Sequence, residues 1–198
     1  MKTHSHTRIF LMLFLPILVS ASQQHLIDYK FSHNDTYYSF RGSFFVSFDP
    51  DSVLDLIWDF KNIAEYSGGA KSIVLMSSGE NWYHLTYTYQ KLIFLENRSS
   101  WQRTLDGDER KIVFELLSNS TNLPFTPEME YSIGYYQVKP AIDGCMVEYF
   151  QECRITPGIF EDNTIRMAEK EAINFITELE AFIQRSCYLL DHNRNLHP

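Results

Sequence analysis

The sequence predicts an α+β fold, in which a curved antiparallel sheet of about seven strands wraps on one long C-terminal helix. Three observations lead to this prediction. Most segments between residues 36 and 156 alternate apolar and polar residues with a period of two, which is typical of strands. Two short helical segments follow the first strand. Residues 162–188 carry a long apolar stripe at helical spacing.

Length and composition favour one domain with a real core. The chain has 198 residues, of which 44% are hydrophobic and 15% aromatic. Its 25 acidic residues outnumber its 17 basic ones, for a formal net charge of −8. A phosphate backbone requires a basic surface, so we expect no nucleic-acid partner.

Residues 1–21 are typical of a cleaved secretory signal peptide. Lys2 and Arg8 precede an apolar run over residues 9–19, and Val19-Ser20-Ala21 supplies the small residues of a cleavage site. A membrane anchor is disfavoured, because a spanning helix needs about 20 apolar residues. We therefore expect a secreted or periplasmic protein. Its mature chain would carry 15 basic and 25 acidic residues, a net charge near −10.

The mature chain is expected to begin with an N-terminal extension, residues 22–35, before a first strand at 36–48. Asp49-Pro50 then favours a helix start, since aspartate caps the first turn and proline fits inside it. A second short helix is expected at 59–66, ended by Gly68-Gly69.

Six further strands are expected, each bounded by turn residues. They cover residues 70–77, 81–95, 98–105, 109–118, 129–141 and 144–156. The long helix over 162–188 ends the domain, and a polar, flexible tail is predicted for 189–198.

Residues 44–66 suggest a family. Here Phe44-Phe45-Val46-Ser47-Phe48-Asp49-Pro50 leads into a helix that carries Trp58-Asp59-Phe60, followed by Tyr66. This pattern resembles the START-like or helix-grip superfamily, which includes polyketide cyclase/lipid-transport, coenzyme-Q-binding and pollen-allergen-like proteins. The resemblance covers residues 36–188 and departs at Ser67-Gly68-Gly69, where the family often has a proline. It implies a hydrophobic cavity between the sheet and the long helix.

Alternation along the strands and the helix suggests which residues would line such a cavity. The ligand-binding candidates are Tyr83, Leu85, Tyr87, Tyr89, Phe114, Tyr131, Tyr135, Tyr149, Ile176 and Leu179. Their tyrosine hydroxyls would orient an amphipathic ligand such as a lipid, quinone, sterol or polyketide. Alternation does not show which face of a sheet contacts solvent. The alternatives that these tyrosines lie on the solvent face or pack in a solid core therefore stay open.

Catalytic chemistry has little support in the sequence. His84 is the one histidine inside an expected strand, and it is only a weak candidate because it has no assigned carboxylate partner. Glu148 and Glu152 alternate with Tyr149 and are therefore expected on the solvent side. No phosphate loop, nucleophile elbow or metal-ligand spacing occurs, and we expect neither a cofactor nor a metal.

The three cysteines can be placed on these elements. Cys145 begins the last strand and Cys187 ends the last helix, so an antiparallel arrangement brings the two together. If a disulfide forms, we expect it to join Cys145 and Cys187 and leave Cys153 as a buried thiol.

Three functions remain open at this point. The first is an exported binding or transport protein for a small hydrophobic ligand, with transient membrane contact during ligand exchange. The second is a cyclase- or hydrolase-like enzyme that acts on such a ligand. The third is a protein-interaction module with a collapsed cavity and an exposed apolar patch.

Overall fold

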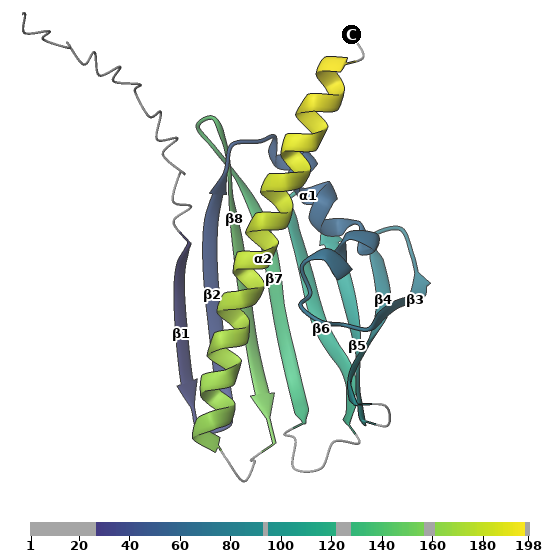
Figure 1. Cartoon of the computed structure of the whole chain (residues 1–198), viewed down its shortest axis with the longest axis vertical. Helices are drawn as coiled ribbons and strands as arrows, with labels where there is room; N and C mark the ends of the chain where they lie inside the picture. Colours follow the sequence, from purple (N-terminus) through teal and green to yellow (C-terminus); the bar gives the residue numbers. More distant parts are fainter. Residues whose placement is uncertain (1–26, 93–94, 122–127, 157–160, 197–198) are drawn as a thin grey trace, which may run out of the picture.

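The computed structural model describes residues 27–92, 95–121, 128–156 and 161–196. Eight strands form one antiparallel sheet in the order β1-β2-β8-β7-β6-β5-β4-β3 (Figure 1). The strands are β1 (Asp28–Asn34), β2 (Tyr37–Val46), β3 (Ser72–Ser78), β4 (Trp82–Leu92), β5 (Leu95–Asp106), β6 (Lys111–Thr121), β7 (Met129–Ala141) and β8 (Gly144–Ile155). The predicted α+β class, with a long C-terminal helix on an antiparallel sheet, is confirmed.

Two short helices connect β2 to β3. Helix α1 (Pro50–Trp58) begins where expected, because the Asp49 carboxylate accepts a hydrogen bond of 2.8 Å from the backbone N–H of Ser52. A 3-10 helix, η1 (Phe60–Glu65), follows directly, and Asp59 caps it in the same way. Both pack over one end of the sheet, so that Val53, Ile57 and Ile63 lose all contact with solvent.

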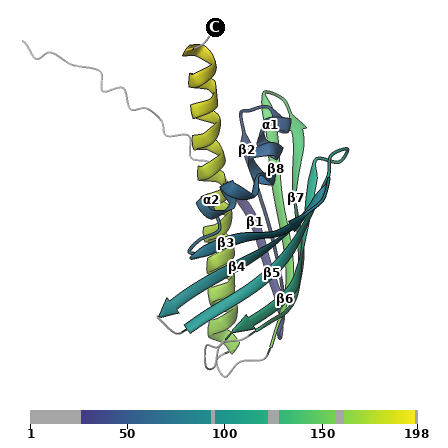
Figure 2. The same ribbon diagram turned by 90° about the vertical axis from the view of Figure 1, so that its right-hand side faces the viewer.

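Helix α2 (Glu161–Leu196) lies diagonally across one face of the sheet (Figure 1). It packs mainly against β2, and its fully buried stripe of Ile176, Leu179 and Ile183 joins the core. Seen from the side, the sheet is strongly curved, and β3, β4 and β5 run from the level of β7 and β8 towards the side on which α2 lies (Figure 2). The helix covers only part of the sheet, and its last turns extend beyond it (Figures 1 and 2).

Two details differ from the sequence prediction. The sheet has eight strands because residues 28–34, assigned to an N-terminal extension, form β1 and pair with β2. Every residue of β1 except Phe31 is exposed, although Ile27, Tyr29 and Phe31 alternate with Asp28, Lys30 and Ser32, so the sequence does carry a short strand signal here. Helix α2 continues past residue 188 to Leu196, through part of the predicted tail. The predicted signal peptide, residues 1–21, lies outside the described residues.

The edge strand β3 presents apolar side chains to solvent. Val74 is 50% exposed and Met76 is 64% exposed. Its pairing with β4 shifts register between Leu75 and Ser77, so Met76 is the extra residue of a β-bulge.

Gly134 allows two strands and one ring to pack closely. A Cβ atom at this position of β7 would lie 2.2 Å from the Phe150 carbonyl oxygen and 2.4 Å from the ring of Phe114. Because one of these neighbours is backbone, it cannot move away, and the ring of Phe114 is held over the glycine.

We expect Gly134→Ala to lower the free energy of unfolding by about 1–3 kcal/mol, the usual cost of overpacking. Gly107→Ala is the matched control, because a Cβ there meets nothing within 4 Å. Urea denaturation of both variants measures the difference, and equal midpoints would contradict this account of Gly134.

The cysteines Cys145, Cys153 and Cys187 are all buried and present as free thiols. Burial raises the pKa of the Cys187 thiol to about 12, and the neighbouring Cys145 contributes to the rise. Burial likewise raises the pKa of Cys145 to about 11. Cys145 lies close enough to Cys187 to affect the pKa of its thiol. Both are free thiols in this structure, and the disulfide between them under oxidising conditions stays a prediction.

If the pair oxidises, protein from an oxidising compartment should show one reactive thiol per chain in denaturant, from Cys153. Three thiols per chain would contradict the disulfide. In the native state we expect little alkylation near neutral pH, because the buried thiols stay protonated. A thiol-reactive chromophore, added before and after unfolding, gives both counts.

Candidate functional site

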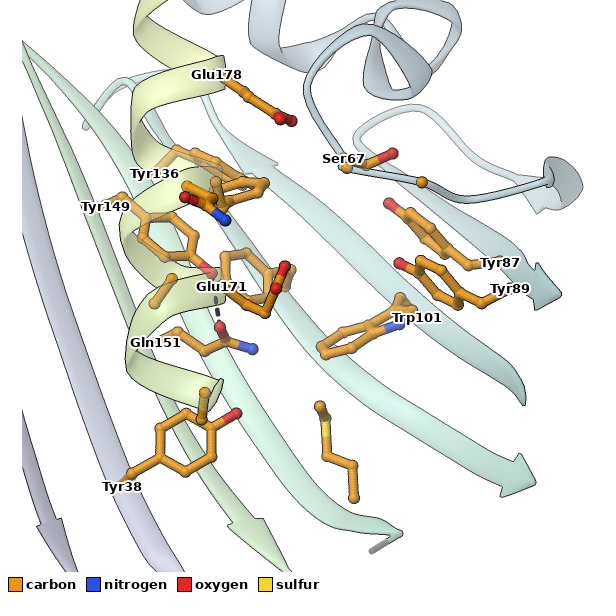
Figure 3. A pocket seen from close by; sticks show the side chains of 18 of the residues that line it. Tyr38, Ser67, Tyr87, Tyr89, Trp101, Tyr136, Tyr149, Gln151, Glu171 and Glu178 are labelled. Atoms are coloured by element: carbon orange, nitrogen blue, oxygen red, sulfur yellow. Dashed lines mark hydrogen bonds between the residues drawn. The ribbon is translucent and has the colours of Figure 1, made fainter. Parts of the chain in front are cut away.

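A cavity of about 520 Å³ lies between α2 and the part of the sheet that the helix leaves uncovered (Figure 3). The lining comes from three sources: strands β2 and β4–β8, the segment before β3, and the first half of α2. Its lining residues are Tyr38, Ser67, Gly68, Gly69, Tyr87, Tyr89, Trp101, Arg103, Phe114, Met129, Tyr136, Tyr149, Gln151, Ala168, Glu171, Ala172, Asn174, Phe175 and Glu178.

Aromatic rings form most of the inner wall. Phe114 stacks on Tyr149 with 5.7 Å between ring centroids, and Tyr149 contacts Phe175 of α2 at 4.9 Å. Trp101 packs edge-on against Phe114 at 6.0 Å. The strand residues among them sit at alternate positions, so the pleat directs their rings to the face that α2 covers. The result is an apolar wall with a fixed shape.

One cation is buried in this wall. Arg103 of β5 is 5% exposed, and tyrosines surround its guanidinium group. Its Nη1 donates to the Tyr66 hydroxyl at 3.3 Å, and its Nη2 donates to the hydroxyls of Tyr87 and Tyr136, both at 3.4 Å. The guanidinium carbon also lies 5.2 Å from the centroid of the Tyr136 ring, within the range of a cation–π contact.

Burial keeps the phenols near Arg103 protonated. It raises the pKa of Tyr83 to about 12, although Arg103 opposes the shift. The pKa values of Tyr87 and Tyr136 are raised for the same reason and against the same opposing charge. At neutral pH the cluster is therefore a cation within a ring of neutral hydroxyl groups.

A second polar group in the cavity is internally hydrogen-bonded. The Tyr149 hydroxyl donates to Gln151 Oε1 at 2.7 Å (Figure 3), and Gln151 Nε2 donates to the Ser132 hydroxyl at 2.8 Å. Buried polar groups are stable when they satisfy one another in this way.

Helix α2 and the segment before β3 approach each other at one side of the cavity. Glu178 faces Ser67 there (Figure 3). Gly68 and Gly69 have φ angles of 53° and 90°, which favour glycine. The carboxylate of Glu178 would lie 3.5 Å from a Cβ at Gly68, so the helix and this segment approach each other closely.

By sequence alone, no family model and no curated protein matches the chain. Solved structures do match its architecture. A protein of Thermus thermophilus has a TM-score of 0.63 at 12% identity, over 77% of this chain and 98% of its own. The Zhui aromatase/cyclase from Streptomyces sp. R1128 has a TM-score of 0.61 at 13% identity, over 75% and 93%. A STAR-related lipid transfer protein from Xanthomonas axonopodis has 0.57 at 12% identity, over 80% and 93%.

The chain has the helix-grip fold of START-like proteins. This confirms the fold that the resemblance in residues 44–66 implies. At identities this low, the likeness establishes the fold and assigns no ligand.

The helix-grip cavity contains four of the ten residues proposed from the sequence as ligand-binding. These are Tyr87, Tyr89, Phe114 and Tyr149. In Figure 3, Tyr87 and Tyr89 lie next to each other with their hydroxyls towards the cavity. Four other candidates, Tyr83, Leu85, Ile176 and Leu179, are buried in the core but do not line the cavity. The hydroxyl of Tyr83 instead donates to the Trp58 carbonyl oxygen at the end of α1.

The inward placement of Tyr131 and Tyr135 was wrong. Both lie on the opposite face of the sheet, where their hydroxyls donate to Glu152 and Glu148 at 3.0 Å. The reason is register: the next residue, Tyr136, pairs with the inward-facing Tyr149, which turns its neighbour Tyr135 outward.

The weak catalytic candidate His84 also lies away from the cavity. One ring nitrogen is 2.7 Å from Gln102 Oε1, and the other is 3.1 Å from the Ser77 hydroxyl. Glu148 and Glu152 are on the outer face as expected, where Glu148 pairs with Arg41 and Lys139. Among the described residues, no group of three or more His, Cys, Asp or Glu could hold a metal ion. None of the described helices is long and apolar enough to span a membrane.

Sequence reasoning missed Arg103, Trp101 and Tyr136. A signal for the first two was present in β5, where Trp101, Arg103 and Leu105 alternate with Gln102 and Thr104. An arginine that shares an inward-facing series with two apolar residues is predicted to be buried. A buried charge is costly unless hydrogen bonds or an opposite charge compensate for it.

Three tyrosines near Arg103 should give the fold an alkaline limit. Because folding raises the pKa of Tyr83, Tyr87 and Tyr136 above the ordinary value of about 10, their protonation stabilises the fold fully below that pH. We expect this stabilisation to be lost as the pH rises through about 12, the value for Tyr83. Phenolate absorbance and near-ultraviolet circular dichroism, followed together, should change in one step. If every tyrosine ionises while the circular dichroism of the folded protein is retained, the predicted alkaline limit is wrong.

Proposed function

We propose that this chain is an exported protein that binds or carries a small amphipathic ligand between its sheet and α2. The observation that carries the proposal is the cavity of about 520 Å³, with aromatic walls and inward hydroxyl groups. Ligand sites are usually apolar cavities of about 300–1,000 Å³ with a few convergent polar groups. Export rests on the sequence of residues 1–21.

The fold comparison is compatible with this proposal. Proteins named as an aromatase/cyclase and as a STAR-related lipid transfer protein have the same fold. In this fold one helix covers only part of a curved sheet and leaves a cavity beside it. The cavity follows from the fold and does not by itself identify a ligand.

The described lining favours binding over acid–base catalysis. A cyclase- or hydrolase-like enzyme would need a histidine or a buried carboxylate beside a cavity tyrosine. The cavity residues named above include no histidine, and the carboxylates of Glu171 and Glu178 belong to exposed residues of α2. The interaction-module hypothesis required a collapsed cavity, and the open cavity counts against it.

Ala172→Trp tests the proposal by filling the cavity from α2. Ala172 lines the cavity, so an indole ring there would take the space of the ligand. We expect the fluorescent probe N-phenylnaphthylamine to bind the variant roughly tenfold more weakly or worse, a loss of about 1.4 kcal/mol. Titration by fluorescence measures the affinity.

The matched control is Ala181→Trp, on the exposed side of the same helix. It should bind the probe as the unmodified protein does, and circular dichroism should show that both variants fold. Binding that survives Ala172→Trp, or no binding by the unmodified protein, would contradict the proposal.

A further inference from the structure

Arg103 is a buried charge without a buried counter-charge. In the part of the chain that the structure describes, no carboxylate lies within ion-pair distance of its guanidinium group. Its hydrogen-bond acceptors are neutral phenol oxygens. Arginine does not lose its proton in proteins, so the fold maintains a full positive charge at the cavity wall. Burial of an uncompensated charge is costly, and a function that uses the charge explains why it is kept.

Two tyrosines extend this positive site into the cavity. The hydroxyl oxygens of Tyr87 and Tyr136 accept hydrogen bonds from Arg103, and each O–H proton remains available as a donor. Among the described residues, neither proton has an acceptor, in contrast to the Tyr66 hydroxyl, which donates to the Ile57 carbonyl oxygen. A hydroxyl that accepts from a cation is a stronger donor, because hydrogen bonds in a chain polarise one another.

The two polar regions of the cavity therefore differ. Tyr149, Gln151 and Ser132 satisfy one another and need no ligand. In the cluster of Arg103, Tyr87 and Tyr136, by contrast, the O–H protons of both tyrosines lack an acceptor within the described chain, and the positive charge lacks a carboxylate. The lining also offers apolar surface to a ligand body, through Trp101 and Phe114 beside the cluster.

We propose that the ligand of this cavity is an amphipathic acid, whose anionic oxygen group binds Arg103 and the hydroxyls of Tyr87 and Tyr136. This inference rests on the proposed function and adds the chemical class of the ligand. The apolar body of the acid lies along the aromatic wall. Its anionic group replaces the missing counter-charge and accepts the two free O–H protons. A cationic ligand is excluded from the interior by Arg103.

Two probes with nearly the same ring system test the charge requirement. Anilinonaphthalenesulfonate carries a sulfonate, and N-phenylnaphthylamine lacks it. We expect Arg103→Met to weaken binding of the sulfonate probe at least tenfold and binding of the neutral probe less than threefold. Tyr87→Phe and Tyr136→Phe each remove one oxygen atom, and each should weaken only the sulfonate probe, by a few fold. These two variants keep the test decisive if Arg103→Met does not fold.

Tyr131→Phe is the matched control, because it removes a hydroxyl from the outer face of the sheet. It should change neither affinity. Inorganic sulfate at millimolar concentration should not displace the sulfonate probe, and displacement would show a site for free anions instead of an amphipathic acid. Equal losses for both probes, or a sulfonate affinity that is independent of Arg103, would overturn the inference and leave the proposed function intact. Failure of the unmodified protein to bind either probe would overturn both.

Discussion

A single helix is too narrow to cover an eight-stranded sheet. A helix with its side chains is about 10–12 Å wide, whereas eight strands at about 4.8 Å spacing extend over more than 30 Å. Helix α2 packs mainly on β2, and α1 with η1 closes one end of the sheet. Strands β4–β6 lie beside α2 and not beneath it (Figure 1), so their inner face is left to side chains, and the curvature of the sheet brings these strands round towards the helix side (Figure 2). The cavity is a consequence of this geometry.

The same curvature explains why a charge can be buried in the cavity wall. It brings Tyr87 of β4 and Tyr136 of β7 to Arg103 of β5, although β5 and β7 are not neighbours in the sheet. Tyr66 reaches the same arginine from the end of η1. Phenol oxygens from three elements thus partly replace the hydration of the guanidinium group. The alternation in β5 could indicate that Arg103 is buried, but its tyrosine partners depend on the packing of the whole domain and no short motif could have indicated them.

The sequence predicts most elements of this fold because their alternation reflects burial on one face. It fails for β1, an edge strand in which nearly every side chain is exposed and which is held mainly by pairing with β2. At the site, Tyr87, Tyr89, Phe114 and Tyr149 could be proposed because their strands have one clearly apolar face. In β7 the more apolar set, which includes Tyr131 and Tyr135, faces outward. The inward set includes Gly134, which accommodates the ring of Phe114. Only the register between β7 and β8 shows which of the two sets of residues faces the cavity.

The bulge in β3 affects how the protein behaves at high concentration. An edge strand with Val74 and Met76 exposed offers unpaired backbone groups and apolar side chains to a second molecule. The extra residue at Met76 interrupts the regular spacing of those groups between Leu75 and Ser77. A strand from another chain could therefore pair with either half of β3 but not continue across the bulge. This irregularity protects the open edge of the sheet against growth into fibrils, without a charged residue within the strand.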